Sequence, residues 1–146
     1  MLKTLLIATA LMLTSLASVA KPIASDENNV MPLLNGHQIP AVTLLDVDGK
    51  AVELSKLVAQ KPTIFFFYRG GWCPFCNSQM GQLKAIEPKL LEMGFQFTTP
   101  AGDKRLVLPV PAVYVADKSG LIHFQYVNPN YKVRPAPELI LTAAEL

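Results

Sequence analysis

The chain of 146 residues is poor in several residue types, and each shortage excludes a class of protein. Its two histidines, His37 and His123, stand far apart and without the paired spacing of metal ligands. Because a structural zinc site needs four ligands, two cysteines alone make at most half of one, and we expect no metal and no cofactor. Charged residues make up 16% of the chain, the formal net charge is +2, and there is no run of Lys or Arg. Nucleic-acid binding requires clustered basic side chains, so it is not expected.

A membrane-spanning segment is also missing. The apolar run Leu5–Leu16 is shorter than the roughly 20 residues that a spanning helix needs. Lys3 precedes this run and Ser18-Val19-Ala20 follows it, which is the pattern of a secretory signal peptide. No cysteine near the cleavage site would carry a lipid. We therefore expect residues 1–20 to be removed after Ala20, leaving an exported protein, periplasmic or secreted, without a membrane span.

The mature chain of 126 residues is long enough to bury a core without a disulfide. We expect residues 21–40 to be a flexible leader and residues 41–146 to form one domain of mixed α/β class. Apolar periodicity and turn residues predict its elements in order. They are a hairpin over 41–54, a short helix over 55–60, strands over 63–68 and 95–98 with a helix from Pro74 between them, strands over 112–116 and 121–127, and a helix from Pro137.

Proline and glycine punctuate the long helix, which carries both of the chain's cysteines at its start. Pro88 should kink or divide this helix, and Gly94 is a candidate C-cap. The apolar residues that repeat along it are expected in the core: Met80, Leu83, Ile86, Leu90 and Leu91.

Cys73 and Cys76 form a C-P-F-C pair at a strand-to-helix turn. The strand breaks at Arg69-Gly70-Gly71, and Pro74 suits the first position of a helix. Both sulfurs should then lie at a helix N-terminus, where peptide dipoles and Arg69 stabilise a thiolate and lower its pKa from about 8.5 to the range ~3.5–7.5. We expect Cys73 at the exposed end of the turn and Cys76 to be more buried. This arrangement favours a redox-active dithiol.

A static disulfide is the alternative from the residues alone. Export makes a structural bridge plausible. However, cysteines three positions apart close a very short loop, and the stabilisation by a disulfide grows with loop length. Reversible redox chemistry is therefore the favoured interpretation.

The chain resembles the peroxiredoxin-like members of the AhpC/TSA family, which have the thioredoxin fold. Three stretches that cover most of the mature chain carry the resemblance: GHQIPAVTLLDVDGKAVEL, TIFFFYRGGWCPFCNSQMGQL and LPVPAVYVADKSGLIHFQYVNPNYKVR. The resemblance implies a thiol-dependent oxidoreductase with antioxidant activity. Its partners would be a hydroperoxide or a protein disulfide as substrate and an external thiol as reductant.

The dithiol departs from the family pattern P-x-x-x-T-x-x-C. Matching by position puts Arg69 on the Pro, Cys73 on the Thr and Cys76 on the peroxide-attacking cysteine. The family's activating Arg falls at about Pro111 and is absent there. In thioredoxins the same position is a cis-proline beside the dithiol, so we expect the Val110–Pro111 bond to be cis.

Two catalytic schemes follow from this resemblance. In the peroxidase scheme Cys76 attacks a hydroperoxide and Cys73 then closes the disulfide. In the exchange scheme Cys73 attacks a substrate disulfide and Cys76 resolves the mixed disulfide. Trp72 and Phe75 are expected to frame either site, and Tyr68 is expected in the core. A truncated or non-catalytic exported domain remains a further alternative.

The chain is short in the middle. Family members insert a helical segment between the positions of Phe97 and Leu106, where eight residues stand here. The topology can close without it, but one face of the sheet should lose its helix, although Ile64–Phe67 is apolar on both faces. We therefore expect an uncovered sheet face, which would serve as a homodimer interface or make the protein poorly stable.

Overall fold

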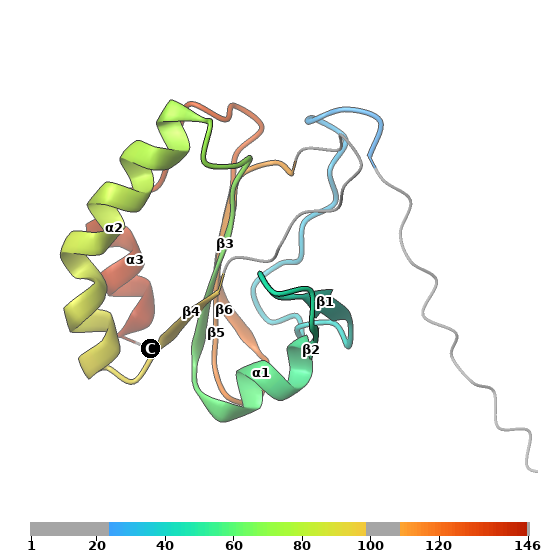
Figure 1. Cartoon of the computed structure of the whole chain (residues 1–146), viewed down its shortest axis with the longest axis vertical. Helices are drawn as coiled ribbons and strands as arrows, with labels where there is room; N and C mark the ends of the chain where they lie inside the picture. Colours follow the sequence, from blue (N-terminus) through green and yellow to red (C-terminus); the bar gives the residue numbers. More distant parts are fainter. Residues whose placement is uncertain (1–23, 99–108, 146) are drawn as a thin grey trace, which may run out of the picture.

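The computed structural model describes residues 24–98 and 109–145. Their order of elements agrees with the expected hairpin, βαβ and ββα units of a mixed α/β fold (Figure 1). The elements are β1 (Thr43–Leu45), β2 (Ala51–Glu53), α1 (Leu54–Gln60), β3 (Thr63–Phe67), α2 (Pro74–Glu92), β4 (Gln96–Thr98), β5 (Ala112–Ala116), β6 (Ile122–Val127) and α3 (Pro137–Ala144).

A four-stranded sheet in the order β4-β3-β5-β6 forms the centre of the molecule, and β1 and β2 form a separate hairpin. Strand β4 is parallel to β3, because α2 carries the chain back between them. Strand β5 is antiparallel to β3, and Phe67 pairs with Ala112. The end of β3 and the start of β5 therefore meet at the edge of the sheet where the dithiol lies.

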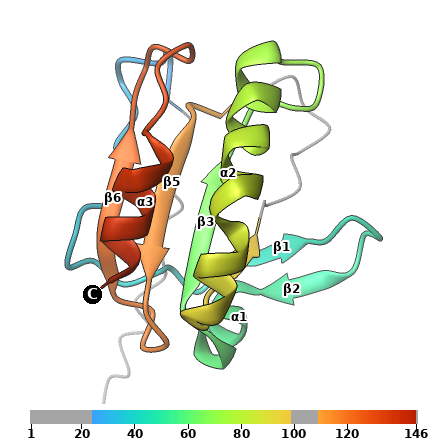
Figure 2. The same ribbon diagram turned by 90° about the vertical axis from the view of Figure 1, so that its left-hand side faces the viewer.

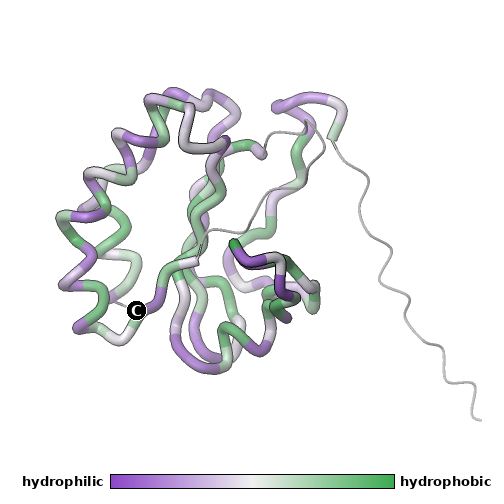
Figure 3. Tube along the Cα trace, viewed as in Figure 1, coloured by the Kyte–Doolittle hydropathy of each residue, from purple (hydrophilic) through white to green (hydrophobic). Residues whose placement is uncertain are grey.

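Helices α2 and α3 cover one face of this sheet, as Figure 2 shows. Every second residue of β3 and β5 points to this face, as the pleat of a strand requires. The buried residues here include Ile64 and Phe66 of β3, Leu83 and Leu90 of α2, and Ile140 of α3. Figure 3 shows the hydrophobic colouring of the central strands between the layers.

The other face is covered as well, so the expectation of an uncovered sheet face is wrong. Phe65 and Tyr114 pack there against Leu54 and Val58 of α1, and Leu44 of β1 adds to the layer. This cover comes from segments before β3 in the chain and needs no helix after β4. The homodimer expected through a bare face, and the poor stability, lose their structural basis. Residues 99–108, the shortened connection, lie outside the described residues.

Helix α2 continues through Pro88, so the chain does not divide there. It ends where Gly94 takes a φ of +86°. The Gly94 N–H donates to the Leu91 carbonyl and the Phe95 N–H to the Leu90 carbonyl, which confirms the glycine C-cap. Leu91 is 53% exposed, so its expected place in the core is wrong.

The last part of the expected leader is attached to the sheet. The Gly36 N–H donates to the Ile122 carbonyl, and the Ile39 N–H donates to the Gly120 carbonyl, each at 2.8 Å. Leu33 also packs against the covered second face. The packed part of the domain thus starts before residue 41. The expected signal peptide, residues 1–20, lies outside the described part of the chain, and within that part no helix is long and apolar enough to span a membrane.

Candidate active site

The loop between β3 and α2 sets the position of both cysteines. Gly70 takes a φ of +135°, which a side chain would strain, and a Cβ there would stand 2.7 Å from the Trp72 ring nitrogen. The Gly70 carbonyl accepts a hydrogen bond from the Cys73 N–H at 3.1 Å. Cys73 is the N-cap residue of α2 and Pro74 is its first helical residue, as the sequence predicted.

Both cysteines are free thiols and both are buried. Cys73 is 1% exposed and Cys76 is 0% exposed, so the expectation that Cys73 lies at an exposed end of the turn is wrong. The segment after β6 returns beside the start of α2, where the Tyr131 ring contacts the Phe75 ring edge to face, with centroids 5.8 Å apart. The sequence could not locate this cover, because it comes from residues more than 50 positions away.

The pKa of the Cys73 thiol is lowered. Its burial raises the pKa, but the hydrogen bond from the Cys76 thiol, the backbone N–H groups of Cys76 and Phe75, and the charge of Arg134 together outweigh burial. These N–H groups belong to the first turn of α2, where no intrahelical carbonyl is available to them. The predicted stabilisation of a thiolate at this helix N-terminus is therefore present at Cys73.

The pKa of the Cys76 thiol is raised instead. Burial is the main cause, followed by its role as donor to Cys73, while the Arg69 backbone N–H and the Arg134 charge act in the opposite direction. Arg134 Nη2 donates to Cys76 Sγ at 3.2 Å. A guanidinium therefore stands directly against the more buried sulfur.

Arg134 is the residue that the sequence reasoning missed. The family's activating arginine would fall at Pro111, where this chain has none. Arg134 instead reaches the dithiol from the irregular segment before α3. The only signal was an arginine that stood between β6 and the proline that opens α3. A contact over 58 positions could not be inferred from spacing.

The proline element before β5 differs from the prediction. The described residues contain no cis peptide bond, so the expected cis bond between Val110 and Pro111 is wrong. Pro111 is buried beside the sheet edge, and its carbonyl accepts the Asn128 N–H at 3.4 Å. Val110 and Pro111 instead line a pocket next to the dithiol.

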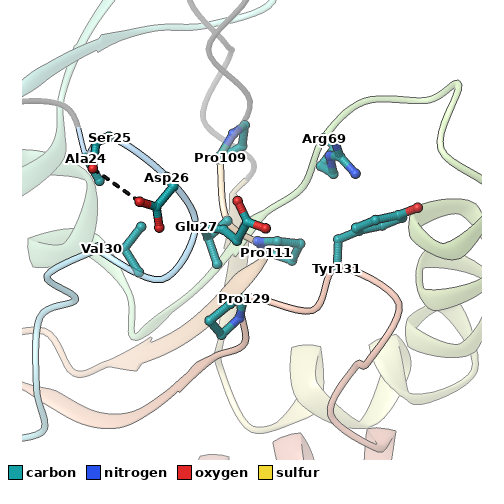
Figure 4. Close-up of a pocket in the computed structure, with 11 residues that line it drawn as sticks. Ala24, Ser25, Asp26, Glu27, Val30, Arg69, Pro109, Pro111, Pro129 and Tyr131 are labelled. Carbon is teal, nitrogen blue, oxygen red and sulfur yellow. Dashed lines mark hydrogen bonds between the residues drawn. The ribbon is translucent and has the colours of Figure 1, made fainter.

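This pocket has a volume of about 500 Å³ and lies where four segments meet (Figure 4). Its walls come from the leader, the Arg69 loop, the approach to β5 and the exit of β6; they include Asp26, Glu27, Val30, Arg69, Pro109, Val110, Pro111, Pro129 and Tyr131. Neither cysteine belongs to this lining. The pocket therefore adjoins the dithiol through Arg69 and Tyr131 and does not contain the sulfurs themselves.

Trp72 and Phe75, expected to frame the site, do not belong to the pocket lining, so their framing role stays a prediction. Trp72 is 66% exposed and Phe75 is 38% exposed. The Arg69 guanidinium lies 5.7 Å from the Trp72 ring centre and 4.3 Å from that of Tyr131, so it makes cation–π contacts with both rings. Tyr68 is half-buried rather than a core residue.

Among the described residues, two buried side-chain donors of this region have no hydrogen-bond partner. One is Arg134 Nε and the other is Gln79 Nε2, on the buried side of α2 one turn after Cys76. An unpaired buried donor costs free energy, and Arg134, which contacts Cys76, is therefore available to an acceptor that enters the site. Gln79 occupies a buried position of α2 that is otherwise filled by apolar residues, and this polar exception in the repeat was the feature of the sequence that could have identified it.

Comparisons with known proteins show similarity in the part of the chain that holds the dithiol. The model of the AhpC/TSA family matches residues 35–99, which contain the hairpin, the dithiol and α2. The chloroplastic peroxiredoxin Q of Oryza sativa subsp. japonica is 26% identical over 149 aligned residues, which cover 77% of this chain and 68% of the relative.

Solved structures share the fold at low sequence identity. The reduced 2-Cys peroxiredoxin of Plasmodium vivax matches with a TM-score of 0.62 and 14% identity, over 78% of this chain and 81% of that one. A thiol:disulfide interchange protein DsbE from Chlorobium tepidum matches with a TM-score of 0.57 and 20% identity, over 77% and 99%. Residues 35–99 are thus similar to the AhpC/TSA family, and the chain shares its fold with solved peroxiredoxins and with the DsbE protein.

Proposed function

We propose that this protein reduces hydroperoxides through the Cys73–Cys76 dithiol, after export and removal of residues 1–20. The observation that carries the proposal is the contact of Arg134 Nη2 with Cys76 Sγ at 3.2 Å. A cationic donor beside a buried sulfur stabilises both the thiolate and the negative charge that develops on the oxygen of a peroxide. The similarity to peroxiredoxin Q supports the same reaction.

In the first step the Cys76 thiolate attacks the terminal oxygen of the peroxide. The S–O bond forms as the O–O bond breaks, the sulfur is oxidised to a sulfenic acid, and the leaving alkoxide takes the proton of the Cys73 thiol. Arg134, whose Nη2 contacts Cys76 and whose Nε has no partner among the described residues, is the donor available to the oxygens. The product is an alcohol, or water when the substrate is hydrogen peroxide.

In the second step the Cys73 thiolate attacks the Cys76 sulfenic sulfur. The S–S bond forms and hydroxide leaves, which becomes water on protonation. Two thiols from an external reductant then reduce the disulfide to the dithiol. The place of Cys73 at the N-cap of α2, one turn from Cys76, supports its role as the resolving residue.

Burial of the sulfurs favours a small substrate. With exposures of 1% and 0%, neither sulfur presents a surface to a folded protein, whereas a peroxide of a few atoms needs little opening. Exchange with a protein disulfide would require a larger movement of the loop or of the segment after β6. A hydroperoxide is therefore the better match to this site.

Two observations favour different attacking residues. The lowered pKa favours Cys73 as the thiolate that attacks the peroxide, whereas the contact with Arg134 favours Cys76. One proton remains on the pair after the first ionisation, and the two sulfurs share it through their hydrogen bond. Proton movement between neighbouring sulfurs does not limit the attack, so the stabilisation of the reacting oxygen decides. We therefore give more weight to Arg134 and assign the first attack to Cys76.

Thiol–disulfide exchange is the second candidate, and the lowered pKa of Cys73 favours it. In that scheme Cys73 attacks the substrate disulfide, and Cys76, with Arg134 beside it, resolves the mixed disulfide. The structural similarity to the DsbE protein is consistent with this chemistry.

Two serine variants separate these candidates. Cys76→Ser should abolish the first chemical step with hydrogen peroxide, because no attacking sulfur remains. Cys73→Ser should still give one turnover and a stable sulfenic acid that a dimedone probe captures at Cys76. Stopped-flow peroxide consumption and mass spectrometry of both variants measure this.

The opposite pattern would overturn the assignment. If Cys73→Ser alone abolishes the reaction with peroxide, the attack belongs to Cys73. If neither the native protein nor the variants consume peroxide but the native protein reduces a disulfide substrate, the exchange reaction is correct. Mass spectrometry of the exported protein tests the proposed cleavage, since the mature chain should start at Lys21.

A further inference from the structure

We infer that the pocket beside Arg69 binds the reductant of the dithiol, and that this reductant is a small thiol carrying both a carboxylate and an ammonium group, such as an amino-acid or short-peptide thiol. A peroxide of a few atoms leaves most of a 500 Å³ pocket unused. That volume is in the range that holds organic ligands. The resetting step is the one that brings a larger molecule to the site.

The pocket adjoins the dithiol through two of its wall residues. Arg69, on one wall, lies close enough to Cys76 for its backbone N–H to act against the raised pKa of that thiol. Tyr131, beside Arg69, packs on Phe75, which stands between the two cysteines in the chain. A ligand held here would have its thiol next to the start of α2, where the disulfide forms.

Charges of opposite sign line this pocket. The Arg69 guanidinium makes cation–π contacts with the rings of Trp72 and Tyr131. Glu27 lies on the leader wall, and in Figure 4 its carboxylate points toward the side that carries Arg69 and Tyr131. Among the described residues no ion pair joins Arg69 to Glu27 or to Asp26. Both charges thus line the space without neutralising each other directly.

Asp26 has a different role from Glu27. Its carboxylate accepts the Asn28 N–H at 2.8 Å and bonds the side chains of Ser25 and Asn29, which shapes the turn of the leader. Glu27 follows this turn and is exposed. Asp26 therefore orients the segment, and Glu27 offers its charge to the pocket. A ligand with a carboxylate toward Arg69 and an ammonium toward Glu27 complements both walls.

The chemistry needs two such thiols. The thiolate of the first attacks one sulfur of the Cys73–Cys76 disulfide, forms a mixed disulfide and releases the other cysteine as a thiolate. A second thiolate attacks the mixed disulfide, releases the small-molecule disulfide and frees the second cysteine. The two electrons that reduce the protein come from these two thiols.

Four small thiols that differ in charge test this inference: cysteine with both charges, 3-mercaptopropionate with the carboxylate, cysteamine with the ammonium, and 2-mercaptoethanol with neither. The full mature protein is first oxidised with diamide, so no peroxide is needed. The rate of disulfide reduction with each thiol is divided by the rate with 2-mercaptoethanol. The same ratio is then compared between native protein and variant, which cancels the intrinsic reactivity of each thiol.

Arg69→Gln should lower the ratio about fivefold to tenfold for cysteine and 3-mercaptopropionate, but not for cysteamine, because a charge-assisted hydrogen bond to the carboxylate is lost. Glu27→Gln should lower the ratio for cysteine and cysteamine, but not for 3-mercaptopropionate. Lys118→Gln and Glu87→Gln are matched controls, since each changes the net charge equally at an exposed residue outside the pocket lining. They should leave all ratios unchanged.

If a pocket variant changed the rates with all four thiols by the same factor, the inference would be wrong. It would also be wrong if the control variants changed the ratios as much as the pocket variants do. The inference rests on the proposed function only through the disulfide that the pair must form. If the charge selectivity appears but peroxide is not consumed, the peroxidase proposal fails and the pocket assignment stands. If peroxide is consumed without charge selectivity, the pocket assignment fails and the peroxidase proposal stands.

Discussion

At Cys76 a charged side chain from near the end of the chain meets a buried sulfur. Arg134 Nη2 donates to Cys76 Sγ, and the Arg134 charge lowers the pKa of both thiols. Burial acts against ionisation, so without this charge both sulfurs would stay protonated to higher pH. The guanidinium therefore links the acidity of the dithiol to its proposed reaction.

Removal of Arg134 tests this link at the level of one residue. Arg134→Leu should raise the pKa of the pair and lower the rate of the first step with peroxide about tenfold to a hundredfold, as expected for a lost hydrogen bond to a charged group. Arg134→Lys keeps the charge and should recover part of both. The pH dependence of iodoacetamide alkylation reports the pKa, and stopped-flow kinetics report the rate.

The two readouts distinguish chemistry from structure. If Arg134→Leu lowers activity while the pH profile of alkylation stays in place, the residue acts on packing alone. A loss in Arg134→Lys equal to that in Arg134→Leu would mean that the geometry of the fork, rather than its charge, is required.

At the scale of elements, the backbone conformation of the loop between β3 and α2 fixes the position of Cys73. Its two glycines differ: Gly70 has a φ of +135° and faces the Trp72 ring, whereas a Cβ on Gly71 would meet nothing within 4 Å. The carbonyl of Gly70 also holds the N–H of Cys73. One glycine of this pair is thus required by conformation and the other is not.

Gly70→Ala and Gly71→Ala form a matched pair of variants. Gly70→Ala should strain the loop by about 1–3 kcal/mol, displace Cys73 from the helix start and reduce dithiol reactivity. Gly71→Ala should behave like the native protein in both stability and reactivity. Urea unfolding and alkylation rates measure the two effects, and equal results for both variants would contradict this account of the loop.

In the whole molecule, the dithiol and the hydrogen-bonded turn at Asp117 lie at opposite ends of the central sheet. The dithiol follows the end of β3, while the turn between β5 and β6 lies beside its start, where Thr63 pairs with Ala116. In that turn Asp117 Oδ2 contacts His123 Nε2 at 2.7 Å. The Ser119 hydroxyl and backbone also bond the Asp117 carboxylate.

The pKa of Asp117 is lowered from 3.8 to about 2, first by the Ser119 hydroxyl, with burial opposing and with His123, Leu121 and the Ser119 N–H adding to the effect. The folded state thus favours the carboxylate, and its stabilisation is present above pH 4 and lost as the pH falls from 4 toward 2. The full shift would correspond to about 2.5 kcal/mol. Because 38% of this side chain is exposed, solvent screening reduces the expected value to about 1 kcal/mol.

Asp117→Asn should therefore unfold about 1 kcal/mol more easily than the native protein at pH 7, and the difference should vanish near pH 2. Its reaction with peroxide should be unaffected, because the turn lies at the far end of the sheet. Urea unfolding across this pH range provides the measurement, and Asp48→Asn, in the exposed hairpin turn, is the control. A constant difference at all pH values would mean that the charge of Asp117 is not the cause.

Much of the molecule follows from local patterns in the chain. The apolar run at residues 63–68, the proline at position 74 and the glycine at 94 predicted β3, the start of α2 and its C-cap. The structure confirms all three, with β3 ending one residue earlier, at Phe67. These features depend on backbone conformation and on contacts within a few residues. For the same reason the dithiol at a helix N-terminus could be predicted.

The errors concern contacts between distant segments. One sheet face was expected to be bare, because α1 and Leu44 of β1 could not be placed over Phe65 from spacing. The cis expectation for Pro111 came from an analogy of position and not from this chain's own contacts. Cys73 was expected to be exposed, because nothing local announced that the segment after β6 returns to the start of α2.

The elements, their order and the paired sulfurs could be predicted from the chain, because periodicity, turn residues and the chemistry of a helix start depend on neighbouring residues. Four features needed the folded molecule: the cover on both faces of the sheet, the burial of both thiols, the contact of Arg134 with Cys76, and the pocket that Glu27 and Arg69 line together. The physical reason is that burial and charge at the site arise from segments that only the folded topology brings together.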